Sequence, residues 1–209
     1  MFNNKKLEVE EIIPKALDWI LDYLHAQGTL ATNTIQPAST QGWRPPPARI
    51  FKMNSDAGVL KPAGIGIGCV FRNWNGEFLG AVAGKETGMC RPVEADARAI
   101  LAGLREANRR GWSPLIVETD CLRLVQLLEK GDEDRTELEV WCKEIRELAT
   151  TNSDMSGKKL EWAFVPRKSN VVAHCLAHLD GHWNQICIWT DCPPNSIRSL
   201  LEAEKAQTV

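Results

Sequence analysis

The stretch GIGIGCVFRNWNGEFLGAVAG, residues 64–84, decides the fold of this chain. It contains two apolar runs of strand length, 64–73 and 76–84, which meet at the turn-forming segment NWNG. Asn-Gly favours the tight turn of a β-hairpin, so the stretch predicts two antiparallel strands. The preceding segment RIFKMNSD, residues 49–56, also has strand character and predicts a third strand. The folded domain is therefore expected to begin with three antiparallel strands.

Helical and strand patterns alternate after the hairpin. Apolar residues recur at helical spacing over about 92–109, 121–130, 137–150 and 169–183, and the apolar segments PLIVET and KLEWAFV lie between helices at 114–119 and 159–165. Strands joined through helices run parallel to each other. The pattern predicts an α/β fold with a mixed five-stranded sheet, three antiparallel strands then two parallel ones, flanked by helices on both faces.

Composition divides the chain into four predicted parts. An amphipathic helix and a linker rich in Pro, Thr and Ser precede the domain, and a tail with a Pro-Pro break and a short helix follows it. These parts are the helix at 1–25, the linker at 26–47, the domain at 48–183 and the tail at 184–209. In the tail, three apolar residues are expected to dock on the domain: Ile197, Leu200 and Leu201.

Composition and charge narrow the classes of function. The 209 residues are 44% hydrophobic and 25% charged, as in ordinary globular proteins. The net charge is −2, so no overall positive field draws the chain to nucleic acid, and any such binding must be local. No apolar run reaches the roughly 18 residues of a spanning helix, and the seven cysteines include no C-x-x-C pair. We therefore expect an intracellular protein of the nucleus or cytoplasm, with no membrane partner.

Three acidic side chains stand at the ends of predicted elements. Asp56 ends the first strand, Glu94 opens the first helix of the domain, and Asp120 follows the strand PLIVET. Clustered carboxylates generally need bound cations to neutralise them, so the arrangement predicts divalent metal ions and phosphodiester chemistry. Each residue also has a plainer structural interpretation: Asp56 as a turn residue, Asp120 as a helix cap, and Glu94 as a partner of the helix dipole.

The helix predicted at 92–109 carries two acidic residues, Glu94 and Asp96, in its first turns. A helical wheel places Glu94 at the margin of the apolar face and Asp96 on the far side, which favours Glu94 as the site residue and a solvated Asp96. The apolar face in this interpretation consists of Val93, Ala97, Ile100 and Leu104.

A stripe of histidines marks the last helix of the domain. His174, His178 and His182 lie roughly opposite its apolar residues, and we expect this face to be solvated with only His174 at the site. The alternative is a zinc site completed by cysteines, but His182 lies about 12 Å along the helix from His174 at a rise of ~1.5 Å per residue, too far to share one ion.

Five segments, taken in order, resemble the ribonuclease H-like domain of plant non-LTR retroelement polyproteins and their relatives. The resemblance covers roughly residues 43–183, and the order of the segments makes it more specific than any one of them. The segments are MNSDAG, GIGIGCVFRNWNGEFLG, VEADARAILAGLREA, IVETDCLRLVQLL and VPRKSNVVAHCLAHL.

The resemblance implies a ribonuclease H-like fold and a nuclease that holds two divalent ions, Mg²⁺ or Mn²⁺, with four acidic side chains. Three of these positions fall on Asp56, Glu94 and Asp120. The fourth falls on His174, because the segment NVVAHCLA has a histidine where the family has an aspartate. Histidine binds Mn²⁺ and Zn²⁺ well and Mg²⁺ poorly, so the metal preference is expected to shift.

The substrate implied by the resemblance is an RNA/DNA hybrid, recognised by its A-form shape, with hydrolysis of the RNA strand. We predict substrate contacts at Gly58, Arg91, Arg167, Lys168 and Asn170, no small-molecule cofactor, and a monomer.

Two hypotheses from other classes stand beside the nuclease. In one, the chain keeps the fold but is catalytically weak or inactive, and serves as a nucleic-acid-binding or interaction module. In the other, the helix at 1–25 or the tail docks a partner protein.

Overall fold

The computed structural model describes residues 42–60, 64–130, 137–151, 160–180 and 184–206. The chain divides into two units, Met1–Ser39 and Thr40–Val209, and all described residues belong to the second. The helix predicted at 1–25 and most of the linker predicted at 26–47 lie outside the described residues. No helix within the described ranges is long and apolar enough to cross a membrane.

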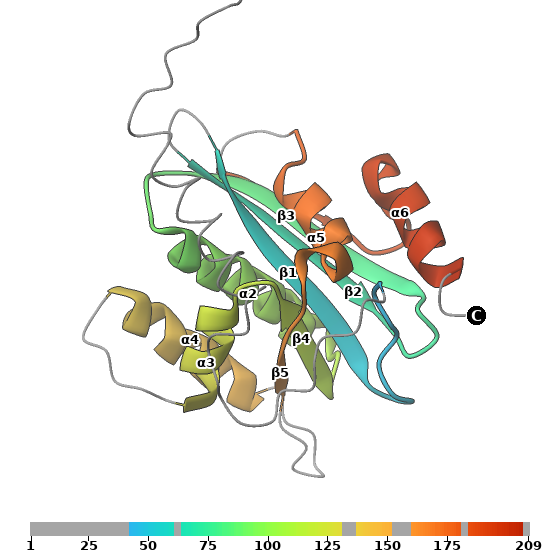
Figure 1. Cartoon of the computed structure of the whole chain (residues 1–209), viewed down its shortest axis with the longest axis horizontal. Coiled ribbons are helices and arrows are strands. Elements are labelled where there is room, and N and C mark those ends of the chain that lie inside the picture. Colours follow the sequence, from blue (N-terminus) through green and yellow to red (C-terminus); the bar gives the residue numbers. More distant parts are fainter. Residues whose placement is uncertain (1–41, 61–63, 131–136, 152–159, 181–183, 207–209) are drawn as a thin grey trace, which may run out of the picture. The chain divides into compact units, whose positions relative to one another are not determined.

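Strands and helices alternate along the domain much as the sequence predicts (Figure 1). The strands are β1 Phe51–Leu60, β2 Gly64–Arg72, β3 Phe78–Thr87, β4 Leu115–Thr119, β5 Glu161–Phe164 and β6 Gln185–Trp189. The helices are α2 Pro92–Arg110, α3 Leu122–Lys130, α4 Glu137–Thr151, the short 3-10 turn η1 Arg167–Ser169, α5 Val171–Ala177 and α6 Asn195–Ala206.

The strands form one mixed sheet in the order β5-β4-β1-β2-β3-β6. β1, β2 and β3 are antiparallel neighbours, while β4 and β5 run parallel to β1, so the α/β class and the predicted strand directions are confirmed. The predicted count of five strands is wrong, because β6 pairs antiparallel with β3. Without β6 the outer side of β3 would present unpaired backbone groups, and a short segment within the tail satisfies some of them.

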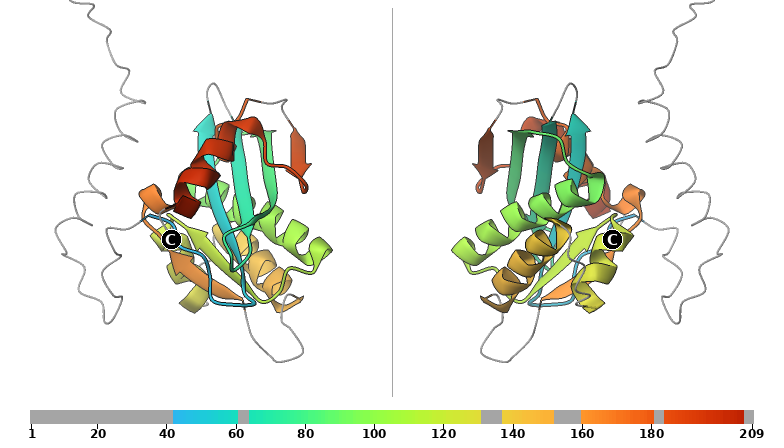
Figure 2. Two further views of the ribbon diagram at one scale, coloured as in Figure 1. Left: turned by 90° about the vertical axis from the view of Figure 1, so that its right-hand side faces the viewer. Right: turned by 90° about the vertical axis from the view of Figure 1, so that its left-hand side faces the viewer.

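Helices cover both faces of the sheet, as predicted (Figure 2). On one face α2, α3 and α4 share the main hydrophobic core with alternate residues of β1 and β2, such as Met53 and Phe71. On the other face α5 and α6 share a second core with Val70 and Ala81. The predicted docking of the tail is observed there, since Ile197 is fully buried and the two leucines of α6 pack beside it.

Glycines in β2 let α5 lie directly on the sheet. A Cβ atom at Gly66 would come within 1.7 Å of the Ala177 carbonyl oxygen, and one at Gly68 within 2.3 Å of the Ala173 carbonyl oxygen. These contacts assign the two glycines to close packing between backbone segments. The close approach also positions the histidines of α5 over β1.

Candidate active site

Asp56 and Asp120 are brought together by the register between two parallel strands. The last pair between β1 and β4 is Ser55 with Thr119, so the two aspartates are the next residues along the chain. β4 ends at Thr119 but β1 continues to Leu60, so Asp56 lies inside a strand and the expectation that it ends one is wrong. The parallel pairing thereby places two carboxylates where β1 and β4 part.

Asp56 is buried next to another carboxylate, and its pKa is raised as a result. Its side chain is almost fully buried. Burial and the charge of Asp120 raise the pKa of Asp56 to about 6, although the hydrogen bond and charge of His174 act in the opposite direction. His174 Nδ1 lies 2.7 Å from Asp56 Oδ2, so a ring N–H donates to the carboxylate. The carboxylate therefore lies in surroundings that favour an added positive charge.

Asp96 is part of the same site. Burial, followed by the charge of Asp56, raises the pKa of Asp96 to about 7; the charge of Asp120 adds to this, while hydrogen bonds with Cys121 and with the backbone of Ala57 oppose it. Asp96 is only partly accessible to solvent. The prediction that Asp96 is a solvated residue on the far side of its helix is therefore wrong.

The sequence contains a signal that places Asp96 on the face of α2 that lies against the sheet. At 100° per residue, Asp96, Gly103 and Ala107 lie within about 40° of one another. Ala107 is fully buried, and a Cβ at Gly103 would come within 2.4 Å of Met53 Sδ in β1, so this line of small residues is the face closest to the sheet. Asp96 lies about two and three turns before these small residues on the same line, which favours it over Glu94 as the candidate.

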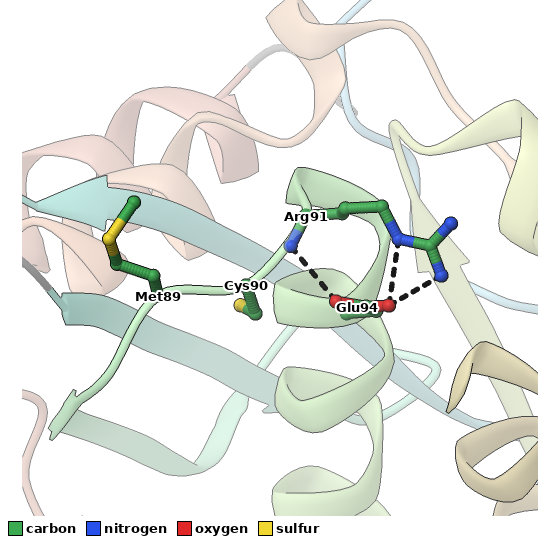
Figure 3. Close-up of a pocket in the computed structure, with 4 residues that line it drawn as sticks. All are labelled: Met89, Cys90, Arg91 and Glu94. Atoms are coloured by element: carbon green, nitrogen blue, oxygen red, sulfur yellow. Dashed lines mark hydrogen bonds and ion pairs between the residues drawn. The ribbon is translucent and has the colours of Figure 1, made fainter. Parts of the chain in front are cut away.

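Glu94 is not brought into this cluster, and its carboxylate is held by Arg91 (Figure 3). Arg91 Nε donates to Glu94 Oε1 at 2.8 Å, and the Arg91 backbone N–H donates to Oε2 at 2.9 Å, which forms a capping box at the start of α2. Burial alone would raise the pKa of Glu94, but the hydrogen bonds and charge of Arg91 bring it below its ordinary value. An open hollow of about 540 Å³ lies here, and its lining includes no residue of the aspartate cluster.

Asp120 is held by Asn170 and does not cap α3. The backbone N–H groups that begin α3 donate to the Cys121 carbonyl, so Cys121 occupies the cap position and Asp120 precedes it. Asn170 Nδ2 donates to Asp120 Oδ1 and to the Ser55 carbonyl, both at 3.0 Å. The amide of Asn170 therefore ties the start of α5 to β1 and to the residue that follows β4.

His174 and His178 both lie at the site. Their ring centroids are 4.3 Å apart, and one ligand atom from each of Asp56, His174 and His178 lies within 4.8 Å of the other two. The expectation that only His174 reaches the site is therefore wrong. Arg167 Nη2 lies 3.4 Å from His174 Nδ1, which puts a guanidinium beside the pair.

The five residues predicted to contact substrate have different surroundings. Arg167 and Lys168 are exposed in η1. Asn170 is buried and donates both of its amide hydrogens within the protein, and the ring of a histidine lies against Gly58. Arg91 is engaged by the acid of its own helix. The two residues of η1 therefore have the surroundings that best suit contact with a phosphate backbone.

The donor set at this site fits divalent cations. Asp56, Asp96 and Asp120 lie close enough for their charges to interact, and burial together with this repulsion raises the pKa of Asp56 and of Asp96. A bound cation reverses this penalty, because opposite charge favours the ionised carboxylate. Oxygen ligands suit Mg²⁺ and Mn²⁺, so Asp56, Asp96 and Asp120 are the residues that would hold such ions.

The fold defines a ribonuclease H-like domain. It is similar to RNase H1 from the halophilic archaeon Halobacterium salinarum, with 22% identity, a TM-score of 0.52, and coverage of 61% of this chain and 93% of that chain. It is also similar to the N-terminal RNase H domain of a Mycobacterium tuberculosis protein, with 21% identity, a TM-score of 0.53, and coverage of 61% of this chain and 89% of that chain. A third similar structure is LC11-RNase H1, which was isolated from compost by a metagenomic approach and solved in complex with an RNA/DNA hybrid. In that complex the identity is 19%, the TM-score is 0.51, and the coverage is 60% of this chain and 92% of that chain.

Residues 54–179 match the model of the reverse transcriptase-like family, which is more than half of the chain. The chain therefore belongs to this family. No curated protein is significantly similar to it. The predicted ribonuclease H-like fold is confirmed.

Proposed function

We propose that this chain is a divalent-metal-dependent endonuclease that hydrolyses the RNA strand of RNA/DNA hybrids. The observation that carries the proposal is the clustering of Asp56 in β1, Asp120 directly after β4 and Asp96 in α2, whose charges raise the pKa of Asp56 and of Asp96. Support for the substrate comes from LC11-RNase H1, which shares the fold and binds such a hybrid. Asp96 takes the place that the sequence analysis gave to Glu94.

In this proposal some side chains bind the ions and others hold those ligands in position. Asp56, Asp96 and Asp120 supply the oxygen ligands, and Asn170 fixes the orientation of Asp120. His174 donates to Asp56 from the fourth position. Ions bound here would supply activation of water and charge for the departing oxygen in an in-line displacement. Exposed Arg167 provides a charge-assisted donor for a phosphate.

The second candidate function is a hybrid-binding module without cleavage. It is favoured by the contact between His174 and Asp56, because a ring N–H then occupies a carboxylate oxygen that an ion would use. A histidine in this position also lacks the charge of a fourth carboxylate. The two candidates share the fold and differ only in whether phosphodiester bonds are cut.

Cleavage of a labelled RNA/DNA hybrid separates these candidates. The wild type is assayed in Mg²⁺ and in Mn²⁺, beside Asp96→Asn and the matched control Glu94→Gln in the same helix. We expect cleavage by the wild type, a loss well beyond about tenfold in Asp96→Asn, and little change in Glu94→Gln, since only Asp96 lies in the cluster.

The variant His174→Asp decides the remaining case. If the wild type cuts nothing in either metal but His174→Asp does, the chain is a domain silenced at its fourth ligand position. Equal loss in Asp96→Asn and Glu94→Gln would contradict the assignment of Asp96.

We infer further that the domain derives from a plant retroelement polyprotein and acts as a monomer. The five ordered segments quoted above support the first inference. Sedimentation of the full chain tests the second, with a single species at the mass of 23.3 kDa expected.

A further inference from the structure

We propose that Asp56, His174 and His178 form a binding site for one transition-metal ion of the Zn²⁺ type. The site shares Asp56 and His174 with the proposed nuclease site, but its third ligand, His178, has no part in that function. One ligand atom from each residue lies within 4.8 Å of the others. Binding of the ion needs no nucleic acid, so the inference can be tested apart from the proposed function.

The spacing of the two histidines suits chelation. His174 and His178 are four residues apart, and the His178 backbone N–H donates to the His174 carbonyl at 3.2 Å, so the helical turn is intact between them. Side chains at this spacing lie on one face of a helix, as in helical zinc sites with two histidines. Their ring centroids are 4.3 Å apart with an interplanar angle of 52°, which suits two rings that face a common point.

Hydrogen bonding leaves a ring nitrogen of His178 available as a ligand. His178 Nδ1 lies 3.0 Å from the His174 carbonyl oxygen, and a carbonyl can only accept, so Nδ1 carries the hydrogen. The neutral ring then has its lone pair on Nε2. A backbone carbonyl that fixes the tautomer in this way is the usual partner of a metal-binding histidine.

Gly58 explains why His178 can lie so close to β1. A Cβ atom at Gly58 would come within 2.7 Å of both Cε1 and Nε2 of His178. Gly58 follows Asp56 by two residues in the same strand, so the two positions face the same side of the sheet. The glycine thereby leaves room for the imidazole on the side of β1 that carries the carboxylate.

The present partners of His174 are those that an ion would replace. Its Nδ1 lies 2.7 Å from Asp56 Oδ2, and Arg167 Nη2 lies 3.4 and 3.5 Å from the two ring nitrogens. Because Nδ1 carries the hydrogen that His174 donates to Asp56, Nε2 is the ring nitrogen of His174 that has a lone pair. Arg167 is exposed, and its long side chain can swing away.

The ligand chemistry selects the ion. Two imidazoles and one carboxylate suit Zn²⁺, whereas Mg²⁺ prefers oxygen ligands throughout. Ligands about 2.0–2.2 Å from Zn²⁺ stand roughly 3.4 Å apart in a tetrahedron, so closing the site needs side-chain movements on the order of 1 Å. His178 is exposed, which leaves a path for the ion to enter.

Calorimetric titration of the full chain with Zn²⁺ and with Mg²⁺, in the absence of nucleic acid, tests the site. We expect His178→Ala to weaken Zn²⁺ binding by at least about tenfold and to leave Mg²⁺ binding unchanged. The matched control is His182→Ala, which replaces the next histidine of the sequence. An unchanged Zn²⁺ affinity in His178→Ala, or equal weakening in both variants, would overturn the proposal.

Exposed thiols need their own control, because thiolates also bind zinc. Cys187 and Cys192 are exposed, so the titration is repeated on Cys187→Ser/Cys192→Ser, where Zn²⁺ binding should persist. Binding that disappears in this double variant and survives in His178→Ala overturns the site. Zn²⁺ binding by a wild type that cuts no hybrid would contradict the proposed nuclease and leave this site standing.

Discussion

At the scale of single residues, the buried carboxylate of Asp96 lowers the stability of the folded protein when it is ionised. Burial and the neighbouring charge of Asp56 raise its pKa to about 7, so ionising it at neutral pH opposes the folded state. The same repulsion makes the site receptive to cations, which is the usual conflict between stability and function at an active site.

Asp96→Asn is therefore expected to stabilise the metal-free protein. A group whose pKa is raised on folding favours the folded state below its unfolded value, near 3.8, and that contribution is lost as the pH rises through about 7. The amide escapes this loss, so we expect a gain of about 1–3 kcal/mol in the free energy of unfolding at pH 8, falling by more than half at pH 5. Urea unfolding in a chelator measures it.

The control for this prediction is Glu94→Gln. Arg91 already holds the pKa of Glu94 below its ordinary value, so this variant should lose stability or stay unchanged at pH 8. A gain in Glu94→Gln equal to that of Asp96→Asn would show that general charge, and not the local cluster, is responsible.

At the scale of elements, a buried chain of polar contacts links helix α6 to the site. Arg72 in β2 forms an ion pair with Glu204 of α6 and donates from Nη2 to Asn54 Oδ1 at 2.6 Å. Asn54 Nδ2 lies 3.3 Å from Asn170 Oδ1, and Asn170 holds Asp120. The tail helix therefore supports the charge of an arginine whose contacts lead to Asp120 of the candidate site.

Removing the acid of α6 should be strongly destabilising. Arg72 is 1% exposed, and Glu204→Gln would leave its guanidinium buried without a full counter-charge. Breaking a buried pair at one partner costs about 3–5 kcal/mol, and because the amide oxygen of glutamine can still accept from Arg72, we expect a smaller loss of about 2–3 kcal/mol. Thermal or urea unfolding measures this loss.

The matched control lies on the same helix. Glu202 of α6 is exposed, so Glu202→Gln should change the free energy of unfolding by no more than about 0.5 kcal/mol. Similar losses in the two variants would mean that the helix responds to any charge change and that the pair with Arg72 has no special weight.

At the scale of the whole molecule, the regular elements were predictable and the special contacts were not. Hairpin turn chemistry and apolar periodicity specify β1 to β5 and their helices, because each acts over a few neighbouring residues. β6 was missed because Ile186 and Ile188 remain about half exposed and the strand depends on a distant edge. Local context predicted that Asp56 and Asp120 lie side by side, whereas the position of His178 depends on the fit of α5 on the sheet, which no local pattern encodes.

The overall charge sets how this protein should bind a hybrid. With a net charge of −2, binding depends on a few local cations, and Arg167 and Lys168 are exposed together in η1 beside the site. Each phosphate contact contributes close to −1 to the slope of log K against log salt concentration. We therefore expect a slope of only about −2 to −3, made shallower by about one unit in either Arg167→Gln or Lys168→Gln.

Fluorescence anisotropy of a labelled hybrid, with Asp96→Asn as the background to prevent cleavage, gives these slopes. Arg105→Gln is the control, because Arg105 pairs with Glu144 on the helices that cover the opposite face of the sheet from α5. A slope steeper than about −5, or one that falls equally in Arg105→Gln, would mean that the hybrid runs over a wider surface. If the slope becomes shallower only in Arg167→Gln and Lys168→Gln, the phosphate backbone lies across η1. It then runs next to the carboxylates that are proposed to hold the catalytic ions.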